Sequence, residues 1–396
     1  MKNILIAIRS IFKKGRHNVM KIVSLGIGLA VGLVLIAKVY FEQSYDDFYP
    51  DRDRVYQVWA KYQQNGGELK DYPQTSGGIA PTMQQQIPEI ETVTRYTSFG
   101  DWTFTMTDTK MKYSGRCIIA DSCFFDILPR PMLIGNAKEV LSTPMYVLIS
   151  SRIAKNIGGD VIGKNFTVDN SPGRTMTIGG VFEEVPENSH SRYDVIVSMA
   201  SAGRFMWEGS PTNMLGNDRY ISYVKLHKGV NPLALEEQVR TFVNSYFPPE
   251  EQQKTGFNIG FSFHELDGLH KELPQVKRMT WILSLLAFAL IFTAVMNYIL
   301  IVISSIVNRS KEVAVHKCYG ASENNIHGMM FGEALVHIVL SLILALLLIL
   351  AFRGTVEELL ATSLDSLLLS NGSLVLLGIC ILVFFVSGFM PGSLYA

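Results

Sequence analysis

Residues Ile22–Ala37 read IVSLGIGLAVGLVLIA, a run without a charged side chain, bounded by Lys21 and Lys38. Continued to Phe41, the run is long enough to cross about 30 Å of hydrocarbon as a helix. A cleaved signal peptide is the alternative interpretation. It is disfavoured because no small-x-small cleavage site follows and the next residues are bulky or acidic. The sequence therefore predicts a retained first transmembrane helix.

Within this run, Gly28 and Gly32 form a G-x-x-x-G pair. Two glycines on one face of a helix allow a second helix to approach closely. We expect both positions to be packing contacts. The motif is too short to identify the partner helix.

Three further apolar segments follow much later in the chain. They are Met279–Asn308, Leu335–Phe352 (preceded by Glu333) and Ser366–Ala396, whose most apolar part is Leu374–Phe389. Each is long enough to cross a bilayer. The sequence therefore predicts four transmembrane helices.

The charge distribution predicts how these helices are oriented. The first 41 residues carry seven Lys or Arg and no acid, although the formal net charge of the chain is zero. Lys and Arg flanking a span are retained in the cytoplasm, so the N-terminus is expected inside. Counting crossings then places residues 42–278 and the loop 353–365 outside, and the loop 309–325 and the C-terminus inside. Such an asymmetry indicates two compartments and not a nucleic-acid surface.

The middle of the chain has globular composition. Val55–Trp59 and Thr92–Thr97 have strand character and flank a helix over Pro81–Gln86. The same order recurs later, with strands at Tyr220–Leu226 and Phe257–Phe263 around a helix. Asn231-Pro232 should open that helix as an N-cap followed by a proline at the first position. Apolar residues then recur at helical spacing: Leu235, Val239, Phe242, Val243 and Tyr246.

Two β-α-β halves around an insertion predict a split ferredoxin-like layer with an inserted lobe at about 100–215. The expected fold class is therefore an α-helical membrane part joined to an α+β extracytoplasmic domain. The expected domains are residues 1–41 (cytoplasmic N-terminus and first helix), 42–278 (extracytoplasmic domain) and 279–396. The last holds three transmembrane helices and a cytoplasmic loop at 308–325.

One apparent nucleotide motif lies in the insertion. Gly158–Lys164 reads GGDVIGK and matches the first seven positions of a P-loop, but Asn165 stands where Ser or Thr should bind magnesium. A strand-like Phe166-Thr167-Val168 follows, where a phosphate site requires a helix N-terminus. We therefore interpret the segment as a glycine-rich turn.

No catalytic constellation is apparent in the sequence. Ser189 and His190 are neighbours in the chain, which does not make a triad, and no orienting carboxylate is identifiable. An acidic stretch holds Asp46, Asp47, Asp51 and Asp53, alternating with aromatic residues and with Arg52 and Arg54. A calcium site is conceivable there, but a salt-bridged, solvated surface is favoured. Cys117 and Cys123 could pair outside the cytoplasm, which stays open. We expect no metal, no cofactor and no enzymatic activity.

A mixed-charge segment lies between the second and third predicted spans. It reads RSKEVAVHK over residues 309–317 and has helical character; Gly320 should end this helix and Glu323 begin the next. A short helix at the membrane surface is suited to docking another protein, and an ordinary helical loop is the alternative. The residues proposed for this contact are Arg309, Lys311, Glu312, His316, Lys317 and Gly320.

Few polar groups occur within the spans. Asn297, Glu333 and His337 are the main ones, too few to line a pathway for a polar solute. An intramembrane Glu333 is a functional candidate. Its position near the end of a helix favours a capping or inter-helix contact, and His337 is expected to pack.

These segments together resemble the MacB/FtsX-type ABC transporter permeases, in the form found in Bacteroidetes, with a MacB-like periplasmic core domain. The resemblance covers essentially the whole chain, in order. It rests on Glu42–Phe48, Ala120–Phe125, Gly179–Phe182, Val185–His190, Asn297–Leu300, Arg309–Ser322 and Phe331–Ala334. Three positions depart from the family pattern: Ala314 replaces Gly, His316 replaces Arg and Cys123 replaces Asn. The change at His316 weakens the expectation of a fixed charge there.

The resemblance implies a permease subunit in the bacterial inner membrane that works as a dimer, with a second copy or half, and binds a cytosolic ATPase. Its periplasmic domain would move as the ATPases close, for efflux or mechanotransmission. Lipid surrounds such a protein, and a periplasmic adaptor or outer-membrane protein is a further candidate partner. Because the chain ends just after the fourth span, we expect either a shortened chain or the first half of a duplicated permease. The cargo stays open.

A second function class is a membrane-anchored sensor or scaffold that binds a ligand or cell-wall enzyme without transport. Such a protein needs only one or two spans, so the predicted C-terminal bundle favours the permease.

Overall fold

The structure is a computed structural model that describes residues 18–169, 171–319, 323–369 and 371–395. The chain divides into two compact units. One, the helical unit, is formed by the chain up to Ser44 and from Lys271 onwards. The other, the α+β unit, is Tyr45–His270.

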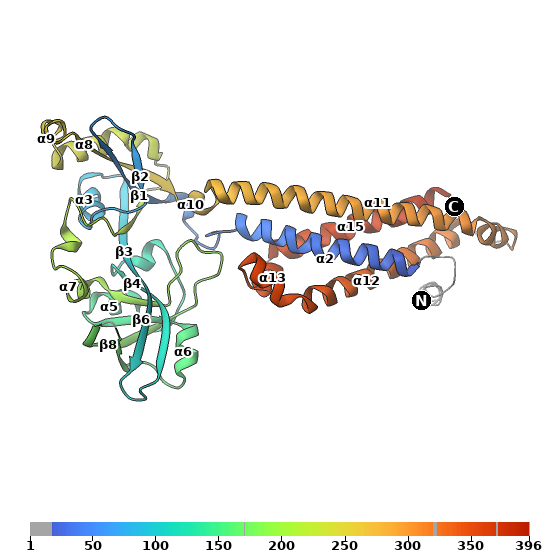
Figure 1. Ribbon diagram of the computed structural model, residues 1–396, viewed down its shortest axis with the longest axis horizontal. Helices are drawn as coiled ribbons and strands as arrows, with labels where there is room; N and C mark the ends of the chain where they lie inside the picture. The colour runs from blue at the N-terminus through green and yellow to red at the C-terminus, as the bar shows by residue number, and fades with distance from the viewer. Residues whose placement is uncertain (1–17, 170, 320–322, 370, 396) are drawn as a thin grey trace. The chain divides into compact units, whose positions relative to one another are not determined.

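The helical unit consists of long apolar helices (Figure 1). They are α2 (Asn18–Gln43), α11 (Pro274–Cys318), α12 (Glu323–Ala351), α13 (Arg353–Leu360), α14 (Leu364–Leu368) and α15 (Asn371–Tyr395). Within the described residues, three segments are long and apolar enough to cross a membrane: Val19–Gln43, Pro274–Leu300 and Ala334–Ala351. A shorter apolar segment, Gly372–Val386, lies in α15. Three of the four predicted spans therefore meet the criterion by length and composition, and α15 meets it only over a shorter stretch.

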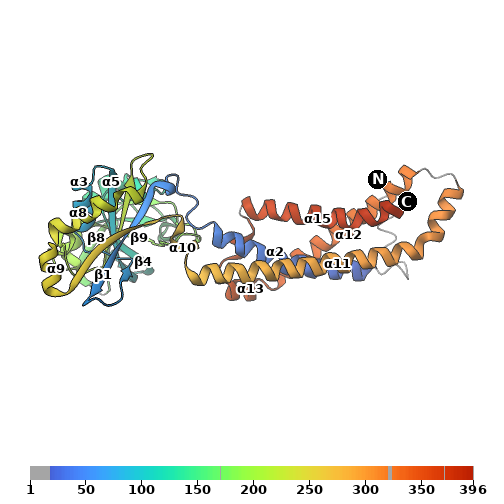
Figure 2. The ribbon, with the colours of Figure 1, turned by 90° about the horizontal axis from the view of Figure 1, so that it is seen from above.

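Helix α2 packs against both α11 and α12 (Figure 2). Its buried face carries Leu25, Leu29, Ala30 and Val34. The contact with α11 includes Tyr298, which is 1% exposed. Aliphatic side chains and close packing hold these helices together, as expected where lipid removes the hydrophobic driving force between them.

One sequence prediction about helix ends in this unit has a clear outcome. The structure describes α12 from Glu323 onwards, and the predicted cap before it lies outside the described residues. The predicted separate surface helix at 309–317 is wrong, because α11 continues without a break from Pro274 to Cys318. The sequence changes from apolar to charged at this point, which suggested a new element. No Pro or Gly interrupts the segment before Gly320, so the helix continues through it.

The α+β unit is built on one continuous sheet of eleven strands. The strands are β1 (Val55–Gln64), β2 (Lys70–Tyr72), β3 (Ile90–Met106), β4 (Lys112–Ala120), β5 (Met132–Ile134), β6 (Tyr146–Ser150), β7 (Asn165–Val168), β8 (Ser171–Phe182), β9 (Val195–Ser198), β10 (Ile221–Leu226) and β11 (Phe257–Glu265). The helices are α3 (Ile79–Gln86), α4 (Phe124–Ile127), α5 (Ala137–Ser142), α6 (Ser151–Ile157), α7 (Ala202–Phe205), α8 (Glu236–Tyr246), α9 (Pro249–Thr255) and α10 (Gly268–Lys271).

The order β11-β1-β10-β3 at one end of the sheet is the ferredoxin-like arrangement expected from two β-α-β halves. Helices α3 and α8 cover the same face of these four strands, over a core that includes Met83, Val239 and Phe242. Two predicted helix starts differ in detail. Helix α3 begins at Ile79, ahead of Pro81. Asn231 does cap its segment, with its side chain accepting from the N–H of Leu233, but the first turn is a 3-10 helix (Pro232–Leu235).

Strands β4-β9-β6-β8-β5 continue the sheet and form the inserted lobe together with β7, which pairs with β3 and β8, whereas β2 pairs with β1. Strand β3 belongs to both parts, since its first half pairs with β10 and its second half with β4 and β7. A bulge between Ser98 and Gly100 separates the two halves, and Gly100 has a φ of +73° that favours glycine. One hydrophobic cluster joins the lobe to the ferredoxin-like part, because it includes both Ile196 and Tyr223.

Candidate functional site

A buried polar network joins the beginning of the α+β unit to its core. Asp46 follows the end of α2 by three residues in the chain and is completely buried. Its carboxylate accepts hydrogen bonds from the Ser189 hydroxyl (3.1 Å) and the His190 N–H (3.3 Å), and it pairs with His190 Nδ1 at 2.8 Å. His190 Nε2 lies 2.6 Å from the hydroxyl of Tyr223, in the middle of β10. We call these four residues the Asp46 network.

The local backbone explains how Asp46 reaches this position. Its φ is +60°, a left-handed conformation that Asp tolerates better than most residues. Its N–H donates to the carbonyl of Asn188 at 2.9 Å, and its carbonyl accepts from the N–H of Tyr49. A turn at Asp46 therefore fixes the chain to the Val185–His190 loop by both backbone and side chain.

One tautomer of His190 satisfies both of its side-chain contacts. With Nδ1–H directed at the Asp46 carboxylate, Nε2 accepts from the Tyr223 hydroxyl. Burial, followed by the nearby Tyr96 and Asp46, raises the pKa of Tyr223 well above its ordinary value, so the hydroxyl keeps its proton. A second contact, from Ser191 to the Tyr96 hydroxyl at 2.8 Å, extends the network.

This arrangement corrects one sequence interpretation. His190 does have an orienting carboxylate, Asp46, which lies 144 residues earlier in the chain and could not be identified from sequence proximity. The constellation still differs from a catalytic triad, because Ser189 contacts Asp46 while the acceptor nitrogen of His190 is taken by a buried tyrosine. The network is suited to fixing the turn at Asp46 to the core of the α+β unit.

Exposed contacts tie the two ends of the α+β unit together. The rings of Tyr45 and His270 are stacked with centroids 3.4 Å apart and an interplanar angle of 7°. Arg52 pairs with Asp47 at 2.7 Å and with Asp267 at 3.3 Å. The first and last residues of this unit are therefore held side by side.

The predicted acidic stretch divides into two kinds of residue. The salt-bridged interpretation is confirmed for Asp47 and for Asp51, which accepts from Lys225 at 2.6 Å and Arg54 at 2.9 Å. Those hydrogen bonds, first from Lys225 and then from Arg54, lower the pKa of Asp51. Asp46 differs, because it is buried in the network described above. Within the described parts of the chain, no group of three His, Cys, Asp or Glu could hold a metal ion.

Two other predicted features of the α+β unit are also located. Gly158–Lys164 forms a turn between α6 and β7, as predicted, so a strand follows the motif. Cys117 and Cys123 are both free, and the Cys123 thiol lies 3.1 Å from the carbonyl of Val93. Burial raises the pKa of both thiols.

In the helical unit, the two predicted glycines face α11. A Cβ atom built on Gly28 would lie 2.4 Å from the Cβ of Ala294, and one on Gly32 would lie 2.7 Å from Ile291. Side chains larger than hydrogen cannot fit at these distances. The structure thus identifies α11 as the neighbour that the G-x-x-x-G pair approaches.

Two of the predicted polar residues of the spans lie in different surroundings. Asn297 lies on an exposed face of α11, whereas His337 is 3% exposed. The backbone of Glu333 is in α12, and its side chain lies outside the description. The same holds for Arg309, Lys311, Glu312, His316 and Lys317 on α11, while Gly320 lies outside the described residues.

Helix α2 contains a buried ion pair that was not predicted from the sequence. Lys38 Nζ lies 2.6 Å from Glu42 Oε1, and both side chains are less than a tenth exposed. The same ammonium donates to the Thr362 hydroxyl at 2.8 Å, just before α14. An i,i+4 Lys–Glu spacing was the available signal, but the chain gave no sign that both charges would be buried.

Comparison with known proteins gives two family matches. Residues 20–242 match the MacB-like periplasmic core domain, and residues 284–396 match the FtsX-like permease C-terminal domain. No curated protein matches the chain.

Among solved structures, the chain resembles a domain from Porphyromonas gingivalis assigned to a permease protein, with 33% identity and a TM-score of 0.50. The match covers 55% of this chain and 91% of that one. Further matches are the periplasmic region of MacB from Actinobacillus actinomycetemcomitans (16% identity, TM-score 0.35, covering 55% and 92%) and the extracellular domain of the noncanonic ABC-type transporter YknZ from Gram-positive bacteria (11%, 0.37, 52% and 98%).

Proposed function

The chain belongs to the MacB/FtsX-type permeases of ABC transporters, and from this premise we propose that it couples ATP hydrolysis by a separate cytosolic subunit to movement of its periplasmic domain. Family membership makes it a permease-type subunit of the inner membrane with a periplasmic domain. The proposal adds the coupling route, a dimer of two copies or halves, and an output of export or mechanical signalling. Four spans with a cytoplasmic N-terminus belong to the same proposal.

The observation that carries the proposal is the continuity of α11. This helix runs unbroken over 45 residues, from Pro274 to Cys318. At about 1.5 Å per residue it is roughly 68 Å long, more than twice the thickness of the hydrocarbon core. Residues 309–317, proposed to contact the ATPase, thus share one helix with Pro274, four residues after the α+β unit ends. A displacement at one end of a rigid helix reaches the other without an intervening hinge.

A second route runs through α2. Its close contact with α11 at Gly28 and Gly32 makes the two helices move as a pair. Three residues after α2, Asp46 is fixed to the core of the α+β unit by the Asp46 network. Both chain connections of that unit are therefore supported by specific contacts, which suits transmission of force better than passive anchoring.

The test is a charge exchange in the proposed contact. Lys311→Glu and Glu312→Lys, singly and combined, are co-expressed with the partner ATPase, and its co-purification and ATP turnover are measured. We expect each single variant to lose both the co-purification of the ATPase and its ATP turnover. Glu358→Lys, at an exposed position of α13 on the segment assigned to the other side of the membrane, is the matched control and should keep both.

Unchanged binding and turnover in all three variants would exclude residues 309–317 as the contact. If, in addition, no ATPase co-purified with the wild-type chain, the sensor or scaffold function would replace the permease assignment.

A further inference from the structure

The two ends of the sheet in the α+β unit are protected differently. At one end β5 has three residues, and short edge strands offer little to an added strand. At the other end β11 has nine residues, FNIGFSFHE, with neither Lys nor Pro. Lys, Pro and bulges are the usual devices that keep an exposed edge from pairing. Strand β11 pairs with β1 on one side, and no described strand pairs with its other side.

The register shows which backbone groups of β11 are available. At the two ends of the β1–β11 pairing, the Leu266 N–H donates to the Val55 carbonyl and the Asn65 N–H donates to the Gly256 carbonyl. Because antiparallel hydrogen bonding alternates, even-numbered residues of β11 bond to β1 and odd-numbered ones point outwards. The N–H of Ile259 is satisfied by the Gln252 side chain at 3.1 Å. The outward N–H groups of Phe261 and Phe263 have no such side-chain acceptor among the described residues.

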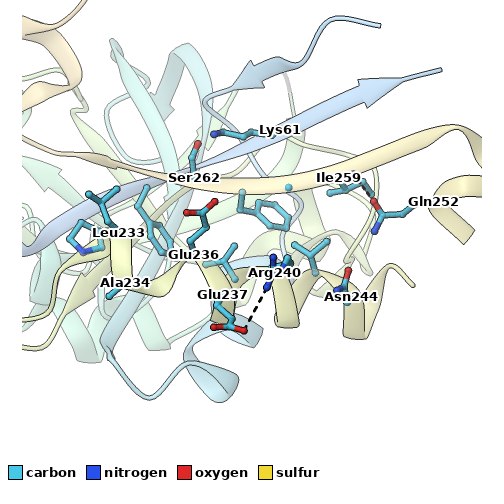
Figure 3. A pocket seen from close by; sticks show the side chains of 16 residues that line it. Lys61, Leu233, Ala234, Glu236, Glu237, Arg240, Asn244, Gln252, Ile259 and Ser262 are labelled. Atoms are coloured by element: carbon cyan, nitrogen blue, oxygen red, sulfur yellow. Dashed lines mark hydrogen bonds and ion pairs between the residues drawn. The ribbon is translucent and has the colours of Figure 1, made fainter. Parts of the chain in front are cut away.

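A groove of about 860 Å³ runs beside this edge. Figure 3 shows β11 crossing above α8, with Glu236, Arg240 and Asn244 on the α8 side and Lys61 and Ser262 on the other. The floor towards α8 is apolar, formed by Val239 and Val243 together with Ile259, Phe261 and Phe263 of β11. A strand beside β11 would therefore place alternate side chains on an apolar floor and direct the others past Lys61.

The charges of the groove distinguish between occupants. Glu237 is paired with Arg240 at 3.6 Å, and Glu236 lies exposed on the same wall. Lys61, half-buried on the opposite wall, forms no ion pair among the described residues, although Asp71 of β2 stands opposite it in the strand register. A second copy of this edge would present Asn258, Gly260, Ser262 and His264 on the Lys61 side, and none of these is acidic. A strand with an acidic side chain there complements Lys61, which a second copy cannot do.

We propose that the β11 edge receives an extended segment of a partner protein, which adds a strand to the sheet. This segment has apolar residues at alternate positions towards α8 and an acidic residue on the opposite face, beside Lys61. Main-chain hydrogen bonds to Phe261 and Phe263 supply the common part of the binding, and the alternate side chains supply the selectivity. The inference does not depend on the proposed function, because its test measures neither ATPase binding nor ATP turnover.

The test uses the full-length protein in lipid nanodiscs and the blocked peptide Thr-Val-Glu-Val-Glu-Val-Thr. Hydrogen exchange at single-residue resolution should show protection of the Phe261 and Phe263 amides on peptide addition. Two N-methylated peptides are the matched controls, one methylated at the Val amides and one at the Glu amides. In an added strand, either the Val amides or the Glu amides face β11. The peptide that is methylated at the facing amides should lose affinity about tenfold or more, and the other should bind normally.

The charge requirement is tested with Lys61→Glu. This variant should bind the Glu peptide about threefold more weakly and the corresponding Lys peptide more strongly. The inference is overturned if the two amides stay unprotected, or if both N-methylated peptides bind as well as the parent. Protection that appears without peptide and increases with protein concentration would identify a second copy as the occupant, and would overturn the partner assignment.

Discussion

The two units bury charged groups in different surroundings. In the α+β unit, Asp46 is enclosed by hydrogen bonds from Ser189 and His190, and the chain of contacts continues to Tyr223. In the helical unit, Lys38 contacts the Glu42 carboxylate, the Thr362 hydroxyl and the ring of Phe41. Removing one charge of a buried ion pair costs more than removing one of several hydrogen bonds, so the helical unit should be the more sensitive.

The largest effect is expected at the buried pair. Lys38→Met removes the cation that lies 2.6 Å from the buried Glu42 carboxylate, which should reduce the free energy of unfolding by about 3–5 kcal/mol. Chemical unfolding in nanodiscs measures the loss. In the double variant Lys38→Met/Glu42→Leu neither charge remains, and stability should return to within about 1 kcal/mol of wild type. If the double variant were as unstable as the single one, Lys38 would act through packing alone.

The next effect is expected in the Asp46 network. Asp46→Ala removes the acceptor for His190 and Ser189 and should cost about 3 kcal/mol, since hydrogen bonds to a buried carboxylate are strong. Asp46→Asn keeps an acceptor and tolerates the positive φ, so it should lose less. Asp53→Ala is the control, because that side chain is exposed. Equal stability of the Asp46 and Asp53 variants would mean that the network contributes nothing to folding.

The difference between local features and long-range contacts decides what the sequence could predict. Hydropathy and charge identified the apolar helices, since membrane spans are defined by local composition. Alternation and spacing likewise identified the strands of both β-α-β halves. The Asp46 network could not be derived in this way, because it joins residues 144 and 33 positions apart and depends on the packing of a turn against β10. Its parts, Glu42–Phe48 and Val185–His190, were visible only as separate family motifs.

The predicted separate surface helix at residues 309–317 illustrates the opposite difficulty. Mixed charge at residues 309–317 suggested a separate element, yet helical propensity continued through it and α11 did not end. Charge determines which environment a helix surface can occupy, whereas a helix ends where caps or unsuitable dihedrals interrupt it. The buried pair at Lys38 and Glu42 shows the same limit, because spacing alone could not indicate burial.

A third effect tests the close contact between helices. Gly28→Leu places a side chain where even a Cβ would lie 2.4 Å from Ala294, so α2 and α11 must separate. Overpacking of this kind should cost about 2 kcal/mol. Gly378→Leu on α15 is the matched control, because a Cβ there meets nothing within 4 Å. Leu has the higher helix propensity, so a loss of equal size in the control would mean that the larger side chain destabilises the unit without any clash with Ala294.

The smallest effect separates exposed from buried charges in the α+β unit. Lys225 and Arg54 lower the pKa of Asp51 below its usual 3.8, so its ionised form is favoured in the folded state. Its contribution to stability is therefore fully present above pH 3.8 and is lost as the pH falls through the lowered value. Because the carboxylate is more than a third exposed, the contribution should stay below about 1 kcal/mol.

The difference in unfolding midpoint between wild type and Asp51→Asn should accordingly be constant near neutral pH, disappear in acid and shrink in high salt. Asp53→Asn, an exposed acid without an ion pair among the described residues, should show no such profile. A difference that persisted at low pH would mean that Asp51 stabilises the unit through hydrogen-bond geometry, as Asp46 does, and the distinction between exposed and buried acids in this segment would no longer hold.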